Sequence, residues 1–378
     1  MRTNLSRMRK FLRRAAILLA CGLFFALAGT IVFTIHCRPT KLAFSPTPET
    51  LHHPAQAANI ANYARDEVDT FYTYPEWYIV WSYQSKADYQ SNHLPSGYSY
   101  FGDIRQFWQA YCCVYAATRG RYPSPIGDHI MLAVIGTSFS VEYALKGLYE
   151  ETIGRFSEWT SHHQPVAEDA YAAQVAENYA AFVHIRPFYE FSFAHALRGL
   201  WSGTPFRSTH LIRSIERRAW LTLDYAVEAV YCEIIQLGTH ATYGFEDSTT
   251  DAWVEFPSSE KTPANLSPAS IKVLRDLGNH QAIVQIPRYQ EFTPIALSLI
   301  HNGVRFHQIA GNELIVISAI SPVSWINSTP NLQLLLAQPL LASPGNTRDV
   351  FLCRVADLHI VLPMLEHQGL KIEHIYDF

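Results

Sequence analysis

Four side chains of this sequence are of types that bind metal ions and lie on segments expected to be helical. They are Glu142, His184, Glu190 and Glu228, and acids and histidines from facing helices form metal sites in bundle cores. The wider pattern argues against a metal, because the 17 histidines include no HExxH motif and no HxxxH pair on an expected helix. Such residues more often form salt bridges or face solvent. We therefore predict no metal centre, and only these four residues would supply ligands for one.

A second set of residues has the character of a small-molecule site. About a third of residues 71–115 are Phe, Tyr or Trp, against 13% of the whole chain. This density fits a core of large side chains, a belt at a membrane interface, or an aromatic-lined groove for a sugar, quinone or lipid. For the groove, the ligand-binding candidates are Trp77, Trp81, Arg186 and Glu190. Arg186 and Glu190 also have the spacing of a structural ion pair, which is the alternative to an anion-binding arginine.

Motifs for covalent catalysis and nucleotide binding are absent from the sequence. The segment 136–140 lacks the final glycine of GxSxG and falls inside an expected helix. There is no phosphate-binding loop and no GxGxxG segment. Glu142 and Lys146 have the order and spacing of a structural ion pair, and Asp224 and Glu228 share a helix face. We therefore lean toward a protein that is not an enzyme, and we assign no catalytic residue and no cofactor.

Charge is divided unevenly along the chain. The 378 residues have a formal net charge of −4, yet residues 1–14 carry only basic charges. The remainder is therefore more acidic than the total, which argues against nucleic acid as a partner. Charged residues make up only 16% of the chain, below the roughly 25% of soluble domains. Part of the surface is therefore expected to face something other than water.

Residues 15–35 predict a transmembrane helix. The run has no charged residue, and its length of about 31 Å matches the hydrocarbon core of a bilayer. Because basic residues stay on the cytoplasmic side, residues 1–14 are expected to be a cytoplasmic tail and the body to lie outside the cytoplasm. Two alternatives remain open: cleavage of a signal peptide at Ala26-Leu27-Ala28, and lipidation at Cys21.

The middle of the chain predicts a spacer and then a helical domain. Residues 36–64 are rich in proline and indicate an extended spacer. Residues 65–244 show apolar residues at helical spacing and predict an all-helical domain. Its helices are expected at 73–89, after the turn at 95–97, at 128–156, 166–186, up to Trp201, and at 209–237 with an end at Gly238. The 128–156 helix should be a buried core helix, with a membrane span as the alternative, and its small residues, Gly136 among them, permit close helix packing.

The C-terminal part contains an internal repeat. Segment 299–309 resembles segment 365–375, and each copy has the order strand, helix, glycine and strand of a βαβ unit. Residues 245–278 predict a linker with one edge strand at 253–256. A hairpin at Gly311-Asn312 is expected after the first copy. Residues 279–378 therefore resemble a ferredoxin-like α/β sandwich, and the whole chain is predicted to be an α+β protein.

The body cysteines leave two interpretations open. In one, Cys112 or Cys113 bridges Cys232 in an oxidising compartment. In the other, these residues are small buried hydrophobic side chains without a bridge.

The function predicted by these features is a membrane-anchored, extracytoplasmic, non-enzymatic binding or assembly component of the cell envelope. Its expected partners are the lipid bilayer, through residues 15–35, and a protein partner or a second copy. The alternative is a membrane-associated enzyme or carrier that binds a small molecule, lipid or metal in the aromatic-rich helical domain.

Overall fold

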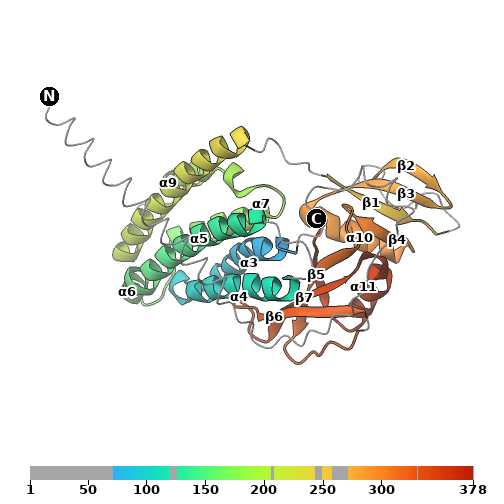
Figure 1. The fold of residues 1–378 in the computed structure, drawn as a ribbon. Coiled ribbons are helices and arrows are strands. Elements are labelled where there is room, and N and C mark those ends of the chain that lie inside the picture. The colour runs from blue at the N-terminus through green and yellow to red at the C-terminus, as the bar shows by residue number, and fades with distance from the viewer. Residues whose placement is uncertain are drawn as a thin grey trace.

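The structure, a computed structural model, describes residues 71–119, 126–205, 208–242, 249–257, 271–329 and 331–377. The predicted cytoplasmic tail, transmembrane helix and spacer lie outside these residues. Within them, no helix combines the length and the apolar character needed to cross a membrane. The described chain forms a helical domain followed by two antiparallel sheets (Figure 1). A mixed helical and sheet fold was the expected class.

Helices make up the first half of the described chain, with short 3-10 or π turns labelled η. They are α3 (Thr73–Gln90), η2 (Pro95–Gly97), α4 (Tyr100–Thr118), α5 (Ile126–Tyr149), η3 (Glu150–Gly154), α6 (Arg155–Thr160), α7 (Ala167–Val183), η4 (Phe188–Glu190), α8 (Phe193–Gly203) and α9 (Leu211–Thr242). Pro187 ends the α7 region as expected, because proline removes a helical hydrogen bond. α9 continues past Gly238, so the predicted end there is wrong.

The close approach of α4 and α5 depends on Gly136. A Cβ atom at this position would clash with the buried ring of Phe107, and a ring in a packed core has little room to move. Gly136→Ala is therefore expected to lower the free energy of unfolding by about 1–3 kcal/mol, as measured by denaturant unfolding. Gly127→Ala on the same helix is the control, because its added Cβ would meet nothing within 4 Å. Equal stability of the two variants would contradict this packing.

Two four-stranded antiparallel sheets form the C-terminal part. Sheet A has the order β2-β3-β1-β4, and sheet B has the order β6-β7-β5-β8. The strands are β1 (Thr249–Glu255), β2 (Lys272–Gly278), β3 (Gln281–Pro287), β4 (Arg305–Ile309), β5 (Leu314–Pro322), β6 (Leu332–Pro339), β7 (Asn346–Arg354) and β8 (Lys371–Ile375). The helical elements among them are η5 (Tyr289–Glu291), α10 (Phe292–His301), η6 (Val355–Asp357) and α11 (Leu358–His367).

The sequence repeat corresponds to a structural duplication. The elements η5, α10 and β4 of the first half recur as η6, α11 and β8 at the same spacing and with the same lengths. The equivalent Gly303 and Gly369 both have a φ of +83°, which glycine adopts without strain. In each half, the strands joined by the helix run parallel, with an antiparallel strand between them. Each half is therefore a split βαβ unit with one further strand.

The structure corrects two expectations about these strands. β1 and β2 both lie in the segment predicted as a linker, and β1 is a central strand because it pairs with both β3 and β4. The turn at Gly311-Asn312 does not close a hairpin, since it carries the chain from β4 in sheet A to β5 in sheet B. The strands expected in one ferredoxin-like sandwich are therefore divided between two sheets.

Sheet B is buried on both faces and joins the helical domain to the duplicated part. Ile315 and Ile317 of β5 belong to the core shared with α10, α11 and sheet A, whereas Val316 packs with α3 and α4. Tyr74 on α3 donates a 2.6 Å hydrogen bond to Gln338 Oε1 on β6. The α3–α4 pair and sheet B therefore share a continuous core.

The cysteines are arranged differently from the predicted bridge. Cys112 is disulfide-bonded, whereas Cys113, Cys232 and Cys353 are free thiols. The predicted bridge to Cys232 is therefore wrong. Cys232 and Cys353 are buried and fill core space as small hydrophobic side chains.

Candidate functional site

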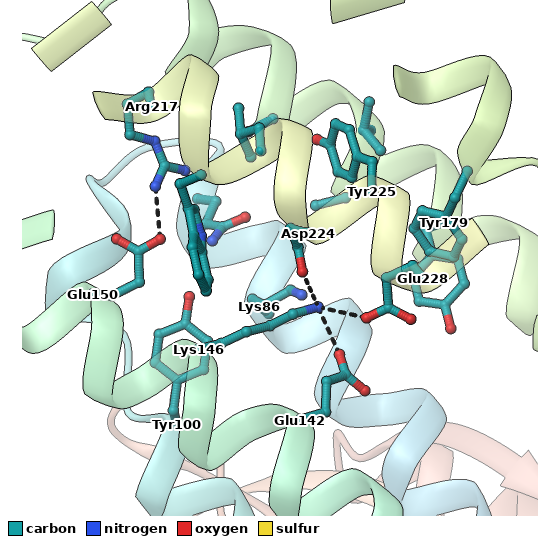
Figure 2. Close-up of a pocket in the computed structure, with 17 residues that line it drawn as sticks. Lys86, Tyr100, Glu142, Lys146, Glu150, Tyr179, Arg217, Asp224, Tyr225 and Glu228 are labelled. Carbon is teal, nitrogen blue, oxygen red and sulfur yellow. Dashed lines mark hydrogen bonds and ion pairs between the residues drawn. The ribbon is translucent and has the colours of Figure 1, made fainter. Parts of the chain in front are cut away.

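The helical domain contains a cavity with charged walls. Lys146 on α5 lies at its centre, with Nζ 2.8 Å from Glu142 Oε1, 3.2 Å from Asp224 Oδ1 and 3.0 Å from Glu228 Oε1 (Figure 2). Glu142 precedes Lys146 by one turn of α5, and the two acids of α9 are also one turn apart. Residues at this spacing share a helix face, so the two helices direct one ammonium and three carboxylates to the same point.

A second ammonium, that of Lys86 on α3, lines the same cavity of about 60 Å³, which has room for a few water molecules. Lys86 Nζ lies 5.6 Å from the ring centroid of Tyr83 and 5.7 Å from that of Tyr143, within range of cation–π attraction. Burial and the charge of Lys146 lower the pKa of Lys86. Burial raises the pKa of Glu228 to about 7, although Lys146 opposes the shift.

Three arginines of α9 form a second ionic cluster. Arg213 is fully buried, with Nη2 2.7 Å from Asp169 Oδ1 and Nη1 3.2 Å from Glu216 Oε2. Its neighbours on α9 also pair with buried acids, Arg217 with Glu150 and Asp169, and Arg218 with Glu168. A buried charge is tolerated where such pairing offsets its desolvation. The interior of the helical domain is therefore held together by ion pairs as well as by apolar packing.

Asp103 on α4 is a buried carboxylate whose partners are phenols. Tyr78 OH donates a 2.8 Å hydrogen bond to Oδ1, and Tyr98 OH donates to Oδ2. Burial raises the pKa of Asp103 to about 6, although both hydrogen bonds lower it. Asp103 therefore holds a proton more tightly in the folded protein than in the unfolded chain.

We expect the Asp103 contribution to stability to fall as the pH rises from about 4 to about 6. The pKa rises from 3.8 to about 6 on folding, so the stabilising effect is complete below the unfolded value and is lost above the folded one. The change amounts to about 3 kcal/mol. In Asp103→Asn this part of the pH dependence should disappear, which unfolding free energies measured across this range will show. Parallel pH profiles of the variant and the original protein would contradict the expectation.

Trp77 and Trp81, two of the predicted ligand-binding residues, are buried where α3 meets sheet B. Their ring centroids are 5.5 Å apart, and Trp77 lies 4.0 Å from His374 on β8. His184, at the end of α7, lies 5.1 Å from Trp81. Each tryptophan is only 5% exposed. Their surroundings are therefore those of a packed core.

The other predicted site residues are brought together only in part. Glu142 and Glu228 meet at Lys146, but His184 lies beside Trp81. Glu190 lies 3.8 Å from Arg186, whose side chain is 65% exposed, so these two form a surface ion pair. Among the residues that the structure describes, no three His, Cys, Asp or Glu side chains are grouped to hold a metal ion.

The outer surface of α5 and α9 is apolar, and we call it the α5–α9 face. Its exposed positions on α5 are Ile126, Gly127, Ile130, Met131, Val134, Val141, Leu145 and Leu148. Those on α9 through residue 237 are Leu211, Ile212, Ile215, Ala219, Leu223, Val227, Val230, Glu233, Ile234 and Leu237. An apolar stripe ordinarily faces the core, but here it faces outward. The prediction that the α5 segment is a buried core helix is therefore wrong for this side of α5.

Sequence reasoning missed several residues of the ionic interior. Lys86 and Asp103 were not singled out, and neither were the three arginines of α9. The signal was present in the sequence, because three arginines within six residues of an apolar helix require buried acidic partners if that side faces inward.

No protein-family model matches this chain, and no curated protein and no solved structure shows significant similarity to it. Its function is therefore argued from the chain's own residues.

Proposed function

We propose that this protein is a membrane-anchored, extracytoplasmic and non-enzymatic binding or assembly component of the cell envelope. The observation that carries the proposal is the α5–α9 face, whose exposed positions on two helices of the helical domain are apolar except for Glu233. Large exposed apolar patches mark contacts with membranes or proteins. In this proposal residues 15–35 are a single-pass anchor, with the N-terminus in the cytoplasm and the body outside.

The ionic interior supports binding rather than catalysis. Lys146 is shared by three carboxylates, and Arg213 is surrounded by acids. These charges neutralise one another and hold α5, α7 and α9 in place. Sheet A packs with α10, α11 and sheet B in a core separate from that of the helices, and in the proposal its edge strand β2 binds a protein partner or a second copy of the chain.

The test uses the full chain in its native membranes. The protein should remain in the membrane pellet after carbonate extraction, and protease on the extracytoplasmic side should degrade its body. Amine-reactive cross-linking should join one defined protein, or a second copy, to sheet A, where Lys272 on the edge strand β2 is exposed. Release by carbonate, protection from the protease, or a monomeric body that captures no protein would overturn the proposal.

We also propose that each C-terminal half is a reduced ferredoxin-like unit. Both halves place the last strand beside the first and the third between the first and second, which is the ferredoxin-like arrangement of strands. Each half has one helix among the described residues, where a complete unit has two.

A small-molecule carrier or enzyme is the second candidate, and the cavity around Lys86 and Lys146 favours it. Shifted pKa values such as those of Lys86 and Glu228 occur at functional sites as well as in structural ion pairs. Native mass spectrometry of the detergent-extracted full chain, with metal analysis, separates the two candidates. A lipid, metal or cofactor retained in stoichiometric amount favours the carrier or enzyme, and a clean apo mass favours the binding component.

A further inference from the structure

On α9 and α5 the charged side chains face inward and the apolar side chains face outward, which is the opposite of the usual arrangement. A helix at a protein–water surface turns its charges outward and its apolar stripe inward. On α9 the three arginines, Asp224 and Glu228 make inward ion pairs, and Glu233 is the only charged residue among the exposed positions described. On α5, likewise, Glu142 and Lys146 face α9, while Leu145 is 61% exposed. The charged side chains of the two helices thus face the interior, and their exposed positions are apolar except for Glu233.

Side chains join the two helices across the charged cavity. Ser138 and Tyr231 share a 2.9 Å hydrogen bond between their hydroxyls, and the rings of Tyr149 and Trp220 stack with centroids 3.6 Å apart. These contacts place the start of one helix beside the end of the other, so α5 and α9 are antiparallel. The polar groups lie between the helices, and the exposed positions of each helix are apolar except for Glu233.

The length of the α5–α9 face and the aromatic residues near it fit a surface in contact with lipid. The apolar positions extend about 39 Å along α9 and about 33 Å along α5, a length sufficient for a helix that lies in the membrane interface with its apolar side toward the acyl chains. Two aromatic side chains of α6 lie near the start of α9, where Phe156 is 62% and Trp159 67% exposed, and Trp201, which is 46% exposed, donates a hydrogen bond to Thr222 further along α9. Glu151 and Arg155, between α5 and Phe156, are also exposed. Tryptophan bordering an apolar surface is typical of the membrane interface.

The near absence of charge on the α5–α9 face indicates that it contacts hydrocarbon rather than another protein or residues 15–35. Protein interfaces keep a polar rim and a substantial polar fraction, whereas a single charged residue occurs among the exposed positions of the α5–α9 face. Residues 15–35 carry no charge on any side, so a helix formed by them would cover the face only by exposing a second apolar surface. Hydrocarbon is the one environment that accommodates both.

We propose that the α5–α9 face contacts the acyl chains of the membrane and is a second membrane-binding surface in addition to residues 15–35. This inference rests on the proposed function, because it requires the helical domain to be held at a bilayer. The ion pairs behind the face keep the helices together where water is excluded, and the apolar side chains replace protein–water contact with lipid.

Photo-crosslinking of the full chain in its native membranes tests this contact. p-Benzoylphenylalanine replaces Val227 on α9 or Leu145 on α5, which are 57% and 61% exposed, so neither change disturbs the core. The matched control replaces Glu177, an exposed position on α7 of the same domain. A further variant carries the probe at Phe24, within the proposed anchor. Phospholipid adducts identified by mass are expected at positions 227, 145 and 24, and none at 177.

The outcomes that overturn the inference are distinct from those that overturn the anchor. An adduct from position 227 or 145 to a second copy, to another protein or to residues 15–35 shows a protein occupant and overturns the inference. So does the lack of lipid adducts at both positions when position 24 gives them, and this result leaves the anchor intact. Lipid adducts at none of the positions overturn the proposed function as well.

Discussion

Replacing Arg213 by methionine is expected to lower the free energy of unfolding by about 3–5 kcal/mol. The guanidinium is fully buried, and it donates to Asp169 at 2.7 Å and to Ser157 Oγ at 2.7 Å. Its removal leaves buried carboxylates with too little positive charge, and methionine fills most of the vacated space. The loss is therefore electrostatic rather than a cavity effect. Denaturant unfolding at neutral pH measures it.

Arg186→Met is the matched control for this change. Arg186 also faces a glutamate, but its side chain is 65% exposed and lies 3.8 Å from Glu190. Exposed ion pairs contribute about 0–1 kcal/mol, so this variant should unfold almost as the original protein does. The double change Arg213→Met with Asp169→Asn should cost less than the sum of its parts, because the two side chains interact. Similar losses for Arg213→Met and Arg186→Met would contradict a low-dielectric interior.

The helices and the duplication were predictable because their signals are local. Apolar spacing located α3 and α4, and Pro187 marked the break after α7. The similarity of segments 299–309 and 365–375 located both βαβ units. Such patterns need only a few neighbouring residues to be read. The division of the strands between two sheets depends on which strands pair over long sequence distances, and no local pattern specifies this pairing.

The orientation of α9 was not predictable from its periodicity. The spacing of Ile215, Leu223 and Val227 shows that the helix has an apolar side, but not what that side contacts. The direction is set by the acids of other elements, such as Glu150 and Asp169, which draw the arginines of α9 inward. The direction in which such an apolar side faces can be predicted only when the residues that contact the other side of the helix are known.

The candidate site was predictable only as pairs within single helices. Glu142 with Lys146, and Asp224 with Glu228, share helix faces by their spacing. The three carboxylates meet at the Lys146 ammonium only because α5 and α9 are antiparallel and in the matching axial register. His184 does not join them, because it lies at the end of α7 and packs on Trp81 instead.

Acid is expected to destabilise the protein through His374. This side chain is fully buried against Trp77, and burial, with a smaller effect of His184, lowers the pKa of His374 from 6.5 to about 3. The folded state thus keeps the imidazole neutral. The stability that this provides is fully present above pH 6.5 and is lost as the pH falls toward the folded pKa. Over the whole range the loss is about 5 kcal/mol, with the steepest part accessible between pH 6 and 4.

His374→Phe should flatten this acid slope, because phenylalanine retains a ring against Trp77 and takes up no proton. Unfolding free energies from pH 7 to pH 4 measure the slope, and His367→Gln, at an exposed position of α11, is the control. Asp103 acts in the opposite direction over part of this range, so the slope of the original protein is smaller than the His374 contribution alone. The difference between His374→Phe and the original protein isolates that contribution. An unchanged acid slope in His374→Phe would assign the acid sensitivity to other groups.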